Sequence, residues 1–102
     1  MITLEMARER AEKSAELTFS NLVTDRPTHW LRDDVIEEKN CWLFLKSKDL
    51  NFRDEAAKAW SDWAIVISKK GKEIAIADHY DDPISLREYL AEISHYLEIR
   101  GE

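Results

Sequence analysis

A β-hairpin pattern in residues 63–78 is the feature that most constrains the fold of this chain. Residues 63–68 (WAIVIS) form an apolar run with a β-branched centre, and residues 73–78 (EIAIAD) alternate as the two faces of a strand do. The intervening residues 69–72 (KKGK) are typical of a turn. Because a short turn joins antiparallel neighbours, we expect two paired antiparallel strands here.

A second hairpin is expected earlier in the chain, in residues 33–47. Residues 41–47 (CWLFLKS) are the clearest early strand and are apolar on both faces. Residues 33–37 give a weaker signal around Val35 and Ile36, and the turn dipeptide Lys39-Asn40 separates the two segments. The polar stretch 48–61 follows as an excursion, in which residues 54–60 (DEAAKAW) have the composition of one or two helical turns.

An amphipathic helix is expected at each end of the chain. Thr3 can cap a first helix, and apolar and small residues then recur at helical spacings: Leu4, Ala7, Ala11, Ala15 and Leu22. The pattern predicts a helix over residues 4–19. A second helix begins at Asp82-Pro83, because Asp suits the N-cap and Pro suits the first helical position. It runs to about Ile99 and stops before Gly101, with a buried stripe of Leu86, Leu90, Ile93 and Leu97.

These elements predict a single α+β domain over residues 1–102. Its order is an N-terminal helix, a four-stranded antiparallel sheet from two hairpins, and a C-terminal helix, with the helices packed on one face of the sheet. The second face of such a sheet is normally polar, but alternation places apolar side chains of residues 41–47 on both faces. One set is Cys41, Leu43 and Leu45, and the opposite set is Trp42 and Phe44. One apolar face is therefore left over, and either the excursion at 48–61 or a partner covers it.

Composition narrows the classes of protein to which the chain can belong. The longest apolar run has five residues, which is far fewer than the stretch of about 18 that a membrane-spanning helix needs. The charged start lacks the apolar segment of a signal peptide. A single cysteine excludes an internal disulfide and suits a reducing compartment. We therefore expect a cytoplasmic protein with no membrane partner.

The charge balance favours a protein partner over nucleic acid. The chain has 15 basic and 21 acidic residues, which gives a formal charge of −6 at pH 7. A phosphate backbone requires clustered Lys and Arg, so nucleic acid is not an expected partner. A basic protein surface is an expected partner, because opposite electrostatic fields speed the encounter.

Neither the cysteine nor the histidines point to catalysis or to a metal. Cys41 lacks the Gly-rich turn or helix N-terminus that would activate it, because residues 42–44 continue a strand. The nearest approach to a metal site is the pair Asp78-His79 with Asp81-Asp82, which is better explained as the acidic start of a helix. We expect no metal, no cofactor and no enzymatic activity.

Two pairs of adjacent acids lie in the first hairpin, Asp33-Asp34 and Glu37-Glu38. Glycosidase-like chemistry needs two carboxylates that face one cleft. Adjacent residues of a strand point to opposite faces, so neither pair can form such a dyad by itself. The pairs are either a solvated hairpin or an acidic patch that meets Lys or Arg on a partner.

Three segments of the chain carry a resemblance to a known family. They are MITL before an Ala-rich helix, CWLFL at residues 41–45, and residues 63–96, in which a Gly-containing turn precedes EI and the last helix opens with PISLREYL. In these segments the chain resembles the immunity protein 35, or YrhB-like, family of bacterial antitoxins. The resemblance implies a non-enzymatic cytoplasmic protein that neutralises a cognate polymorphic toxin domain, delivered by a contact-dependent or type VI-like system.

The predicted partner-binding site combines aromatic anchors with an acidic rim. Trp and Tyr are typical anchors of tight interfaces, and acids suit a toxin with a basic surface. The expected anchors are Trp30, Trp42 and Tyr80, and the expected rim is Asp33, Asp34, Glu37, Glu38, Asp81 and Asp82. Two alternatives would use the same leftover apolar face: a small chaperone or adaptor for unfolded clients, and a homodimer formed through the sheet.

Overall fold

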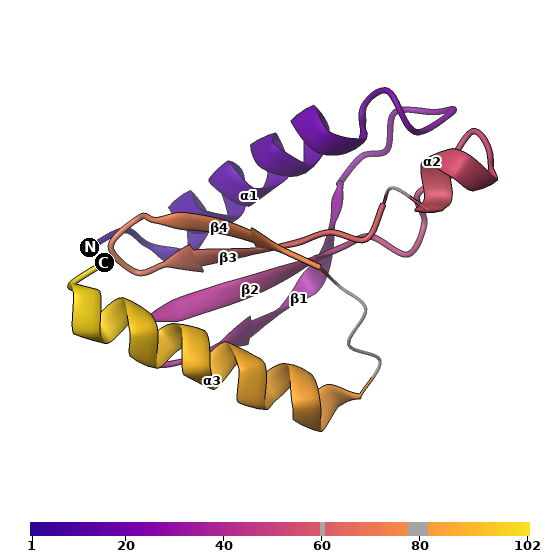
Figure 1. Ribbon diagram of the computed structural model, residues 1–102. Coiled ribbons are helices and arrows are strands. Elements are labelled where there is room, and N and C mark those ends of the chain that lie inside the picture. Colours follow the sequence, from indigo (N-terminus) through magenta and orange to yellow (C-terminus); the bar gives the residue numbers. More distant parts are fainter. Residues whose placement is uncertain (60, 78–81) are drawn as a thin grey trace.

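The computed structural model describes residues 1–59, 61–77 and 82–102, and it has the expected order of elements (Figure 1). The elements are α1 (Leu4–Phe19), β1 (Leu31–Glu37), β2 (Cys41–Lys46), α2 (Glu55–Ala59), β3 (Ala64–Ser68), β4 (Glu73–Ile76) and α3 (Pro83–Arg100). The predicted α+β layout of helix, four antiparallel strands and helix is therefore confirmed. The excursion contains one short helix, α2, as its composition indicated.

The four strands form one sheet in the order β1-β2-β3-β4. Both predicted hairpins are present, and β2 pairs with β3 to join them, with Phe44 opposite Ile65. β1 begins at Leu31, two residues before the expected start, because Leu31 pairs with Lys46 ahead of an irregular stretch. This order leaves β1 and β4 as the two edges of the sheet.

The two long helices lie on opposite faces of the sheet, with α1 above it and α3 below it in Figure 1. The expectation that both helices share one face is wrong. Since β2 and β3 are buried on both faces, each face needs its own cover. α1 packs on the face that carries Trp42, Phe44, Ile65 and Ile67. α3 packs on the face that carries Cys41, Leu43, Ala64 and Val66.

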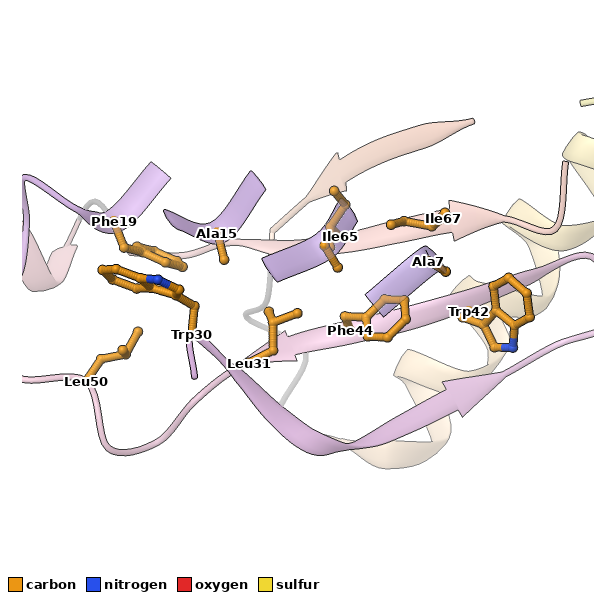
Figure 2. Close-up of a cluster of buried hydrophobic side chains, with 11 residues drawn as sticks. Ala7, Ala15, Phe19, Trp30, Leu31, Trp42, Phe44, Leu50, Ile65 and Ile67 are labelled. Carbon is orange, nitrogen blue, oxygen red and sulfur yellow. The ribbon is translucent and has the colours of Figure 1, made fainter. Parts of the chain in front are cut away.

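The core under α1 depends on small side chains in the helix. Ala7, Ala11 and Ala15 are fully buried, so the backbone of α1 lies close to the strands. Figure 2 shows Ala7 and Ala15 over the aromatic and branched side chains of β2 and β3, with Phe19, Trp30 and Leu50 at one end. The excursion extends this end of the cluster: Leu50 is one of its buried residues, and the ring of Phe52 meets that of Phe19 edge-on at 6.2 Å.

The core under α3 depends on larger side chains. Leu86, Leu90 and Leu97 are the buried positions of the predicted stripe, and Ile93 packs beside them partly buried. A polar contact fixes the β1–β2 turn to this helix: the backbone N–H of Asn40 donates to Ser94 Oγ at 3.0 Å, and Asn40 Nδ2 donates to the Ser94 carbonyl at 3.0 Å.

Three carboxylates around α3 have pKa values below their ordinary range. Hydrogen bonds from the Ile84 N–H and the Ser85 hydroxyl lower the pKa of Asp82, which caps the helix. A hydrogen bond from Lys39 lowers the pKa of Glu98, and the Lys72 ammonium, 3.1 Å from the Glu102 carboxylate, lowers the pKa of Glu102.

We expect the melting temperature to fall on acidification because these pKa values are lower in the folded state than in the unfolded chain. Such groups stabilise the fold above their ordinary pKa values, and the stabilisation is lost as the pH falls below about 4.5. Thermal melts between neutral and acidic pH measure the effect, and the triple variant D82N/E98Q/E102Q should show a shallower pH dependence. An equal pH dependence in the variant would contradict the assignment.

Candidate interaction site at the β1 edge

Both of the predicted aromatic anchors that the structure describes are core residues. Trp30 is 4% exposed and Trp42 is 6% exposed, and both belong to the cluster under α1. The predicted exposed aromatic patch is therefore wrong for these two residues, because they pack into the cluster that α1 covers. The third expected anchor, Tyr80, lies outside the described residues.

The predicted acidic rim divides between two places. Asp82 is the N-cap of α3, where its carboxylate accepts from the Ile84 N–H at 3.1 Å and from the Ser85 hydroxyl at 3.0 Å. The structure thus accounts for Asp82 as a helix cap. Asp81 lies outside the described residues, as do Asp78 and His79 of the suspected metal pattern. The remaining four acids, Asp33, Asp34, Glu37 and Glu38, lie together on β1 and at its end.

We call these four acids the acidic edge, because β1 is an edge strand. Asp33, Asp34 and Glu37 are exposed, and Glu38 is half-buried. Within the described residues no ion pair involves Asp33 or Asp34, whereas Glu37 pairs with the ammonium of Lys69. The Lys69 ammonium also lies 5.4 Å from the ring centroid of Trp42, so the cation of this ion pair contacts a buried aromatic ring of the core.

Asp33 and Asp34 lie where the pairing of β1 with β2 is irregular. Leu31 lies opposite Lys46 and Val35 lies opposite Phe44, so the three residues 32–34 of β1 face the single residue Leu45 of β2. Extra residues of this kind bulge out of the ladder and redirect their side chains. Asp33 and Asp34 are part of this bulge, and both are exposed to solvent.

Side chains of α1 hold the outer backbone of β1 at the bulge. The Glu12 carboxylate accepts from the backbone N–H groups of Trp30 at 2.9 Å and Leu31 at 3.1 Å. One turn earlier, the Arg8 guanidinium donates to the carbonyls of Arg32 at 3.1 Å and Asp33 at 2.8 Å. Arg8 and Glu12, which carry opposite charges and lie four residues apart, thus bind backbone groups of the four consecutive residues 30–33.

Two further contacts extend this row of α1 side chains. The Arg8 guanidinium lies 5.4 Å from the ring centroid of Phe44, and the Glu16 carboxylate pairs with Arg26 at 2.9 Å. A groove of about 990 Å³ runs along the row, between α1 and residues 26–31. Its lining mixes both signs of charge. The roles of Arg8 and Glu12 were not predicted, because their partners are backbone groups that leave no mark in the side-chain pattern.

The chemistry of Cys41 argues against a nucleophilic site. Its side chain is fully buried. Burial, together with the smaller effect of the Glu38 charge, raises the pKa of the Cys41 thiol to about 11. The thiolate is the reactive form of cysteine, so this group is protonated at neutral pH.

No protein-family model, no curated protein and no solved structure matches this chain. Among the described residues, no three His, Cys, Asp or Glu side chains gather as a metal site. No described helix is both long and apolar enough to cross a membrane.

Proposed function

We propose that this chain is a non-enzymatic immunity protein, which binds a cognate bacterial toxin domain in the cytoplasm and neutralises it. The observation that carries the proposal is the acidic edge, where Asp33 and Asp34 project from a bulge without an ion pair to any described residue. The resemblance of the chain to the immunity protein 35 family supports the same function. The toxin would be a polymorphic toxin that a competing bacterium delivers by a contact-dependent or type VI-like system.

The acidic edge is suited to a basic protein surface. Charges of opposite sign accelerate the encounter of two proteins and set their orientation. The Arg8 and Glu12 contacts hold the bulge in place before binding, so little conformational freedom is lost when the complex forms. By covering basic residues of the toxin, the bound domain would occlude its active or substrate-binding surface.

The chaperone alternative rested on an uncovered apolar face of the sheet. Each face of the sheet is covered by its own helix, with Phe44 and Leu43 both fully buried. A holdase needs exposed apolar surface to retain unfolded clients. The acidic edge does not depend on such a surface, and the immunity function is therefore the one we retain.

A growth-rescue experiment tests the proposed function. A candidate cognate toxin domain is expressed in a sensitive host, with the wild-type chain or with the charge-reversal variant D33K/D34K. We expect the wild-type chain to restore growth and the variant to fail, because the variant repels the basic surface. The matched control E88K/E92K reverses two exposed acids of α3 and should still restore growth. Rescue by neither wild type nor control would contradict the proposed function.

A further inference from the structure

The outer edge of β1 is closed along its first half and open along its second. Glu12 and Arg8 bind the backbone of residues 30–33. The next residue in the same row of α1, one turn earlier, is Leu4, whose side chain has no hydrogen-bonding group. The row of backbone contacts thus ends before β1 does, and residues Val35–Glu37 lie beyond it.

The register identifies which backbone groups are left. The Glu38 N–H donates to the Cys41 carbonyl at 2.9 Å, so these two residues form a hydrogen-bonded pair. Antiparallel pairs alternate, which makes Glu37–Trp42 and Val35–Phe44 pairs without mutual hydrogen bonds. The N–H and C=O groups of Val35 and Glu37 therefore point away from β2. Among the described residues, no hydrogen bond from another element reaches them.

The side chains around this open edge form a short pattern. Val35 packs partly buried against the cluster under α1, and Ile36 packs partly buried against the cluster under α3. Acids flank this apolar pair on both sides, with Asp33-Asp34 before it and Glu37-Glu38 after it. A strand added here would extend both apolar faces at its centre and meet carboxylates at its ends.

We propose that the open edge of β1 binds an extended segment of the toxin as a fifth strand of the sheet. This segment carries two neighbouring apolar residues with Lys or Arg on both sides. The inference rests on the proposed function and adds to it the kind of segment that is bound. Strand addition supplies backbone hydrogen bonds, while the flanking charges supply selectivity. A second copy of this chain is disfavoured as the occupant, because antiparallel self-pairing would place acids opposite acids.

The first test uses a synthetic probe, the peptide KKVIKK with blocked ends, titrated into the isotope-labelled chain at low salt and followed by NMR. A control peptide has the same charges but carries N-methyl groups on its two central amides, so it cannot pair as a strand. We expect the amide signals of Val35–Glu37 to shift with the first peptide and the dissociation constant to rise about tenfold with the control. Equal binding of both peptides, or no binding of the first, would overturn the inference.

The second test changes the edge itself. The variant V35P removes the outward N–H of residue 35 and leaves the hydrogen bonds to β2 intact. The control V35A also loses the packing of the Val35 side chain but retains the N–H. We expect KKVIKK to bind V35P about tenfold more weakly than V35A, with similar melting temperatures for the two variants. Equal affinities would overturn the inference. If V35P does not fold, the N-methylated peptide decides the question.

Two outcomes separate this inference from the proposed function. If the toxin domain binds the wild-type chain and V35P equally well, the strand-addition inference is wrong and the proposed function stands. If the toxin domain does not bind the wild-type chain, the proposed function is wrong and the peptide titrations decide about the edge. Sedimentation of the chain alone tests whether a second copy of the chain occupies the edge. A dimer that V35P abolishes would assign the edge to a second copy and overturn the inference that it binds a toxin segment.

Discussion

Substituting Phe44 by Ala should lower the free energy of unfolding by about 3–5 kcal/mol, the range for a large aromatic side chain lost from a core. Phe44 is fully buried in the central strand β2, where α1 covers it and the strand neighbours Val35 and Ile65 lie opposite it. Close-packed alanines of α1 leave little freedom for the helix to collapse into the resulting cavity. Denaturant titration followed by circular dichroism measures the change.

The effect is large because small domains have little stability to lose. A folded domain is typically stable by about 5–15 kcal/mol, so this one truncation removes a major part of the total. The control is Leu17→Ala, a truncation on α1 at a side chain that is 80% exposed, which should change stability by less than about 0.5 kcal/mol. Similar losses for the two variants would mean that α1 does not cover this face of the sheet.

Substituting Glu12 by Ala should be the most damaging change to a charged residue of α1. It leaves the part-buried backbone N–H groups of Trp30 and Leu31 without their acceptor. Loss of a charged hydrogen-bond partner costs about 1.5–3 kcal/mol, and two donors depend on this carboxylate. Chemical denaturation of the variant gives the loss, and the amide hydrogens of residues 30 and 31 should exchange faster with solvent.

Two comparisons separate the contact of Glu12 from the general effect of its charge. Glu9→Ala removes an exposed acid from the same helix and should be nearly neutral. In a double-mutant cycle, Arg8→Ala and Glu12→Ala should be non-additive, because both side chains hold one stretch of backbone. Additive losses would show that the two contacts are independent.

The order of the elements could be predicted because local patterns identify each of them. The apolar segments that contain Leu43 and Val66 are short and bounded by turns, as is typical of strands. Thr3 and Asp82 both cap their helices as expected. In each case the residues that decide the structure lie within a few positions of it. The boundaries differ by one or two residues, chiefly at β1, where a bulge lengthens the strand.

The faces that the helices cover could not be predicted from local patterns. The apolar residues of β2 point both ways, and periodicity does not state which helix meets which set. The expectation of one leftover face led directly to Trp30 and Trp42 as exposed anchors, and their burial follows from the position of α1. Large aromatics in a strand indicate burial against some surface, and here that surface belongs to the same chain.

The candidate site was predicted in part. Charge alone indicated the acids of β1, and their exposure agrees with a solvated edge. The roles of Arg8 and Glu12 could not be predicted, because the partners of these side chains are backbone groups of a distant segment. A bulge also has no strong sequence signal, so the position of Asp33 and Asp34 outside the ladder required the register of the strands.

The rate of association between this chain and the cognate toxin domain, measured by stopped flow at low and at high salt, tests the proposed role of the acidic edge. We expect D33K/D34K to slow association about tenfold at low salt relative to E88K/E92K, and the difference to shrink at high salt. Both variants carry the same change in net charge, so the comparison isolates the acidic edge. Equal association rates for the two variants at low salt would contradict the claim.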